Sequence, residues 1–176
     1  MTWLMLHYRN PLLPPALALA YITLAAAFDA LMMNLIFAPL GWQRVNVYWI
    51  VYWGFYFTTI TVFILATMYL SCVSLTACNP IFCISTPLHW AADVAVLFWS
   101  GWEDTIYYWI NPWEKFPAEL PWLDQTWNLP SIIARLLSHK TVLASDLLAA
   151  NMIGLAIVVA VAAAFLMTPI TCKLQG

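Results

Sequence analysis

The stretch LPPALALAYITLAAAFDALMMNLIFAPL, residues Leu13–Leu40, decides the fold class. A helix needs roughly 20 mostly apolar residues to cross a bilayer. The interior of this stretch holds one acid, Asp29, and one amide, Asn34. Pro14 and Pro15 stand at its start, where a missing backbone N–H costs a helix little. We therefore predict that the chain begins its ordered part with a membrane-spanning helix.

The composition of the whole chain agrees with this prediction. Of 176 residues, 64% are hydrophobic and 8% are charged, and the mean hydropathy is +0.83. Soluble domains average about 45–50% apolar and about 25% charged residues, so the composition excludes a soluble globular domain and a disordered chain. The net charge of −2 provides no electrostatic footprint for a nucleic acid, and we expect no such partner.

Hydropathy and proline positions predict an all-α polytopic integral membrane protein with four spans in one domain, 1–176. The spans are expected at about 13–40, 47–70, 89–110 and 142–169. A third span broken into two pieces is the alternative. We expect an extramembrane loop at 71–88. We also expect a Trp- and Pro-rich segment along the membrane surface at 111–141, with a short amphipathic helix over Ser131–His139.

The basic residues predict an orientation. Four of the six basic residues lie in the first and third loops. These four residues are Arg44, Lys115, Arg135 and Lys140. The positive-inside rule then places loops 41–46 and 111–141 in the cytoplasm and both termini outside. We expect the membrane to be the plasma membrane of a prokaryote.

The four cysteines fall on the outer side in this topology, where disulfides persist. Cys72, Cys78 and Cys83 lie in the second loop, and Cys172 follows the last span. They are disulfide candidates. Four cysteines allow three pairings, and the spacing does not choose among them. Four free thiols are the alternative.

Three acids inside the predicted spans are the candidate catalytic residues. Ionisable side chains within a membrane are costly and usually functional. At about 1.5 Å per helical residue, Asp29, Glu103 and Asp104 reach a similar depth in the inner half of the bilayer. Carboxyl groups at one depth can share a proton and act as general acid and base. The structural alternative has Glu103 and Asp104 hydrated at the interface or paired with Arg44 or Lys115.

An aromatic stripe begins the second predicted span. Tyr48, Tyr52 and Tyr56 recur every four residues and share one helix face, with Trp49 and Trp53 beside them. Such rings could line a site for a lipid, a quinone or a pigment. Packing and interfacial anchoring are the alternative. The sequence requires no cofactor.

A metal site is weakly indicated at the start of the third predicted span. His89 and Asp93, at i and i+4, place two ligands on one helix face. A single histidine leaves the ligand set incomplete, so we expect no intrinsic metal.

The run Trp102–Pro112, WEDTIYYWINP, resembles a signature of uncharacterised small multi-span membrane proteins of bacteria and archaea. Those proteins carry a Glu-Asp pair, two aromatic residues shortly after it, Asn-Pro and then a Trp-rich stretch, which Pro121-Trp122 and Trp127 continue here. They often have His after Pro-Trp, where this chain has Leu123-Asp124. The resemblance covers under a quarter of the chain and implies no particular activity. The acidic pair with aromatic residues is also similar to a helix of membrane carotenoid cyclases, whose acids handle protons on a polyene.

Three functions follow from these features. The small soluble portion and incomplete ligand sets favour a non-catalytic accessory subunit of a larger membrane complex, energy-converting or oxygenase-like. Its partners would be membrane lipids and other subunits. The alternative is a membrane enzyme that acts on a lipid or isoprenoid with intramembrane carboxylates as acid and base. A proton-coupled transporter is the second alternative.

Overall fold

The chain is all-α, as predicted. The computed structural model describes residues 12–39, 50–75, 80–124 and 127–167. Within these ranges every stretch of regular structure is a helix, apart from one isolated β-bridge between Glu119 and Leu143.

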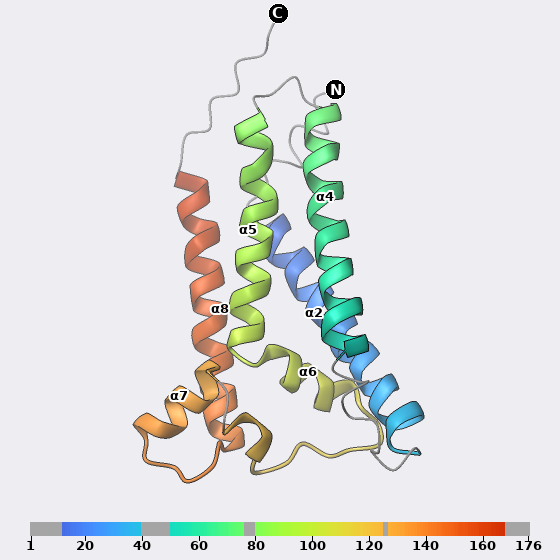
Figure 1. The fold of residues 1–176 in the computed structure, drawn as a ribbon. Helices are drawn as coiled ribbons and strands as arrows, with labels where there is room; N and C mark the ends of the chain where they lie inside the picture. Colours follow the sequence, from blue (N-terminus) through green and yellow to red (C-terminus); the bar gives the residue numbers. More distant parts are fainter. Residues whose placement is uncertain (1–11, 40–49, 76–79, 125–126, 168–176) are drawn as a thin grey trace, which may run out of the picture.

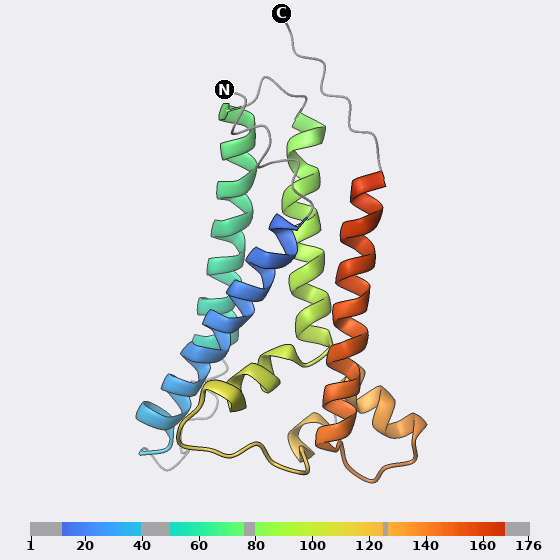
Figure 2. The same ribbon diagram turned by 180° about the vertical axis from the view of Figure 1, so that it is seen from behind.

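Four long helical segments run alternately down and up the molecule (Figure 1). They are α2 (Leu13–Met32) with the π-helical turn η1 (Met33–Phe37), the π-helix η2 (Ile50–Phe57) with α4 (Thr58–Leu75), α5 (Pro80–Trp99), and α8 (Ala144–Met167). Figure 2 shows α2 crossing α4 and α5 obliquely, with α8 on the other side of α5. Helices α2 and α8 lie within the first and last predicted spans, whereas α5 and α6 depart from the predicted third span.

Helix α5 is the centre of the arrangement and contacts α2, α4 and α8. Its buried side chains Trp90 and Leu97 pack against small residues of α2, including Ala18 and Ala26. Small side chains let two helices approach closely, so a large residue from the partner can fill the groove between them. This packing fixes the end of α2 that carries Asp29 against α5.

The predicted third span, 89–110, is not one helix. Helix α5 ends at Trp99, and Gly101 adopts φ +81°, a left-handed conformation that favours glycine. A Cβ at Gly101 would also collide with the side chain of Leu147. The chain therefore turns there, and a separate helix, α6 (Trp102–Ile110), crosses the end of the bundle (Figure 1). The alternative of a broken third span is the correct one.

The predicted loop at 71–88 is also wrong. Helix α4 continues to Leu75, and α5 begins at Pro80, in the first helical position that proline tolerates. Pro87 lies inside α5 without ending it. Helical structure therefore occupies most of this segment, because its other residues are apolar enough to pack as helix.

The segment after α6 folds back beneath the bundle. Asn111 is extended before Pro112, so α6 ends where the sequence predicted. A 3₁₀ turn, η3 (Pro121–Leu123), and the short helix α7 (Leu129–Leu136) follow. The Asn128 side chain caps α7 by accepting a hydrogen bond from the backbone N–H of Ser131. The short helix thus exists as predicted, beginning two residues earlier and ending three residues sooner.

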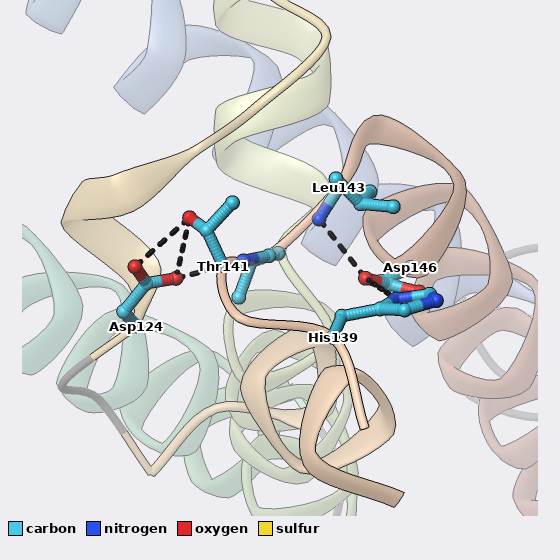
Figure 3. A network of polar contacts seen from close by, with 6 residues as sticks. Asp124, His139, Thr141, Leu143 and Asp146 are labelled. Carbon is cyan, nitrogen blue, oxygen red and sulfur yellow. Dashed lines mark hydrogen bonds and ion pairs between the residues drawn. The ribbon is translucent and has the colours of Figure 1, made fainter. Parts of the chain in front are cut away.

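Two carboxylates hold this segment to α8 (Figure 3). Asp124 accepts hydrogen bonds from the Thr141 hydroxyl at 2.9 and 3.0 Å and from the Val142 backbone N–H at 2.7 Å. Asp146 accepts one at 2.9 Å from the backbone N–H of Leu143, just before α8 begins. A carboxylate there also favours the helix dipole. The Asp124 bonds join the end of η3 to the residues that precede α8.

By length and composition, two helical stretches of the described chain could cross a membrane. They are Leu13–Phe37 and Ala144–Ala164, and the apolar stretch Thr58–Val73 of α4 is shorter.

Candidate functional site

A cavity of about 920 Å³ lies where α6 crosses the lower end of α2, α4 and α5. Such a volume is typical of pockets that hold small molecules. Its described walls combine aromatic and aliphatic side chains with four carboxyl groups. The carboxyl groups belong to Asp29, Glu103, Asp104 and Glu114.

The three candidate catalytic acids meet at this cavity. Asp29 comes from α2, while Glu103 and Asp104 lie in the first turn of α6. Acidic residues in the first turn favour a helix, because the helix dipole is positive there. The left-handed Gly101 aims α6 back toward α2, and this turn brings Glu103 to Asp29. The sequence predicts a similar depth for these acids, and the structure shows that they line one cavity.

Glu103 is the most constrained of the acids. The hydroxyl of Tyr52, which is fully buried, donates a hydrogen bond to Glu103 Oε1 at 3.0 Å. The carboxyl of Asp29 is a close neighbour of Glu103 and raises its pKa. Two neighbouring carboxyl groups can share a proton, because ionising both is costly.

The surroundings raise the pKa values of two carboxyl groups in α6. This helix lies outside the two helical stretches that could cross a membrane. Burial raises the pKa of Glu103 well above its usual range, and the neighbouring Asp104 and Asp29 carboxyls raise it further. Burial also raises the pKa of Asp104, against the lowering effect of a hydrogen bond from Trp122. Carboxyl groups with raised pKa values in a cavity are typical of general acids.

Aromatic donors orient the other two acids. The indole N–H of Trp122 donates to Asp104 Oδ1 at 3.1 Å, and the Tyr107 hydroxyl donates to Glu114 Oε1 at 3.3 Å. Sequence reasoning missed Tyr107, Glu114 and Trp122 as site residues. The only signal was their place in or just after the run Trp102–Pro112.

The weak metal candidates form a separate pair. Nε2 of His89 lies 3.3 Å from Oδ2 of Asp93, one turn apart on α5, and both side chains are buried. Because the chain turns at Gly101, His89 and Asp93 lie on α5 while Asp104 lies on α6. Within the described residues, no group of three His, Cys, Asp or Glu side chains has the arrangement of a metal site.

Two polar residues of α8 have structural roles. Oδ2 of Asp146 lies 2.9 Å from Nδ1 of His139, in the network of Figure 3. The Asn151 side chain donates to the Thr105 hydroxyl, which joins α8 to α6.

The aromatic stripe is described only in part. Tyr52 is buried and stacks on Phe28, with ring centroids 6.2 Å apart. Its hydroxyl donates a hydrogen bond to Glu103. Tyr48 and Trp49, and the side chains of Trp53 and Tyr56, lie outside the described residues.

One predicted disulfide is present. Cys72 near the end of α4 is bonded to Cys83 near the start of α5. Cys78 and Cys172 lie outside the described residues. The bond ties α4 to α5 at the end of the bundle opposite the cavity.

Comparisons of the chain with protein-family models, with curated proteins and with solved structures gave no match.

Proposed function

We propose that the protein is a membrane-embedded enzyme that transfers protons on a lipid or isoprenoid substrate, with Asp29, Glu103 and Asp104 as its acids and bases. The observation that carries this proposal is the convergence of Asp29, Glu103 and Asp104 on one cavity of about 920 Å³, where Tyr52 donates a hydrogen bond to Glu103. Most of the remaining wall is apolar, as an alkyl or isoprenoid chain requires.

The exposed surface supports the membrane setting. Within the described residues, large apolar side chains on the outside of the long helices are exposed, and a bilayer would solvate them. Examples are Leu24 of α2, Phe63 of α4 and Met152 of α8, which are 64%, 67% and 66% exposed. We propose that α2, α4, α5 and α8 all span the bilayer. The segment 111–141 would lie along the cytoplasmic surface, and both termini would be outside, in a prokaryotic plasma membrane.

The carboxyl pair suits proton transfer without a cofactor. A protonated carboxyl can add its proton to one carbon of a double bond, and the electron pair of that bond forms the new C–H bond. A neighbouring carboxylate can then remove a proton from an adjacent carbon, whose C–H electrons form the new double bond. The substrate isomerises, and the site keeps its proton count. Glu103 is the proposed donor, because its surroundings favour the protonated form.

Lipid analysis of a host membrane tests this proposal. Host cells would produce wild-type protein or the variants Glu103→Gln, Asp104→Asn and Asp29→Asn, and their total lipid extracts would be compared by mass spectrometry. Glu119→Gln is the matched control, since Glu119 is an exposed acid outside the cavity. We expect wild type and Glu119→Gln to alter the same lipid or isoprenoid species, and the cavity variants to leave it unaltered. Identical lipid profiles for all five proteins would reject the enzyme.

An accessory subunit is the second candidate, and one observation favours it. The outward face of α8 combines exposed small residues, including Ala149, Ala156 and Ala160, with large apolar ones. Small residues allow another membrane helix to approach closely. Native mass spectrometry of the protein extracted in mild detergent would detect such a partner. A proton-coupled transporter, the third candidate, would produce a carboxylate-dependent flux in proteoliposomes.

A further inference from the structure

The polar part of the cavity wall is rich in hydrogen-bond acceptors. Four of the residues that line it are Asp or Glu, and among the described lining residues none is Lys, Arg or His. These described lining residues therefore offer no cation to pair with an anionic group, and the carboxyl groups repel an anion whenever they are ionised. A ligand with an anionic end would meet like charge there.

Aromatic side chains donate hydrogen bonds to three of the four cavity acids. A carboxylate offers about four lone-pair positions. Each of three cavity acids receives one bond from a ring: Tyr52 to Glu103, Trp122 to Asp104 and Tyr107 to Glu114. These bonds fix the orientation of the carboxyl groups. A ligand that donates hydrogen bonds could use further lone pairs of these carboxyl groups.

We propose that the cavity takes an amphiphile whose polar end donates hydrogen bonds and carries no negative charge, such as a long-chain alcohol or amine. This proposal rests on the proposed function and names its substrate class. The polar end would lie against Glu103 and Asp104, and the apolar chain along Phe57, Val94 and Phe98. Phospholipids with phosphate ends and fatty acids are excluded as substrates by the same charge argument.

The test uses three probes that share one chain: palmityl alcohol, palmitylamine and palmitate. Full-length protein in detergent would be titrated with each probe, and the bound fraction would be read by native mass spectrometry. We expect the alcohol and the amine to bind at least about tenfold more tightly than palmitate, because an anion beside fixed carboxylates is strongly disfavoured.

Charge reversal supplies the sharper comparison. Asp104 is half-buried. The variant Asp104→Lys should reduce or reverse the preference for the alcohol and the amine over palmitate, so that palmitate binds more tightly. Glu114→Lys is the second variant, because Glu114 is exposed and its replacement does not endanger folding. Glu119→Lys is the control and should keep the wild-type preference.

The outcomes separate this inference from the proposed function. If palmitate binds wild type as tightly as the alcohol, the inference fails, while a lipid-binding cavity and the enzyme proposal stand. If the preference exists but is the same in Asp104→Lys and Glu114→Lys, these acids do not set it and the inference again fails. If none of the three probes binds, both proposals fail.

Discussion

At the scale of single residues, Tyr52 is the side chain on which the candidate site most depends. It is fully buried, and its hydroxyl donates to Glu103 at 3.0 Å. We expect Tyr52→Phe to lower the free energy of unfolding by about 1–3 kcal/mol, because a buried carboxyl loses its donor. Thermal unfolding in detergent measures the change. Tyr69→Phe, on α4 and away from the cavity, is the control. Equal melting temperatures for Tyr52→Phe and wild type would contradict this role.

Glu103 makes stability depend on pH. Its pKa is raised in the folded protein, so above the ordinary carboxyl pKa the folded state holds a proton that the unfolded chain releases. The contribution of Glu103 to stability therefore falls as the pH rises through that window, and it levels off above the folded-state pKa. Glutamine carries no such proton. We expect the melting temperature of Glu103→Gln, relative to wild type, to increase with pH. A difference that stays constant between pH 4 and 9 would show that Glu103 does not titrate this way.

The candidate residues were predictable to different degrees. Asp29, Glu103 and Asp104 were identified from depth alone, because an acid is conspicuous in an apolar run. The role of Tyr52 was not, since a four-residue repeat of rings does not indicate where a single hydroxyl donates. Trp122 was also missed as the partner of Asp104. Their contact depends on how the chain folds back after α6, and no local pattern encodes that path.

At the scale of elements, the turn between α5 and α6 positions the site. Gly101 has φ +81°, and a Cβ there would collide with Leu147 and lie 3.2 Å from Pro130 Cγ. We expect Gly101→Ala to lower the free energy of unfolding by about 1–3 kcal/mol and to displace α6 from α2. Gly54→Ala is the matched control, since its added Cβ would meet nothing within 4 Å. Thermal unfolding of Gly101→Ala and Gly54→Ala measures the difference. Equal melting temperatures for the two variants would contradict the need for glycine at position 101.

Hydropathy predicted where helices exist better than where they end. The start of α2 and the end of α6 were predicted well, because prolines mark both. The break at Gly101 was weighed only as an alternative, since the hydropathy of the run continues across it. The loop expected at 71–88 was wrong because prolines were taken as breakers. Pro80 instead begins α5, and Pro87 is accommodated within it.

At the scale of the whole molecule, the two ends differ in chemistry. The disulfide Cys72–Cys83 ties α4 to α5 at one end. The cavity, α6 and α7 lie at the other, together with every described Lys and Arg: Lys115, Arg135 and Lys140. Disulfides persist on the outer side of a plasma membrane, and basic residues favour the cytoplasmic side. Both signals favour the orientation proposed above, with the cavity end on the cytoplasmic side.

This orientation predicts which side of the membrane reaches the start of α8. Ser145 is exposed in the first turn of α8, so Ser145→Cys adds a thiol at the cavity end. In a background with Cys78→Ser and Cys172→Ser, we expect a membrane-impermeant maleimide to label this thiol in inside-out vesicles and not in whole cells. Ile84→Cys in the same background is the control for the outer side, since Ile84 is exposed on α5 near the opposite end of the bundle. Labelling of Ser145→Cys in whole cells would reverse the orientation, and would place the carboxyl pair in the outer half of the bilayer, where its substrate would have to be found.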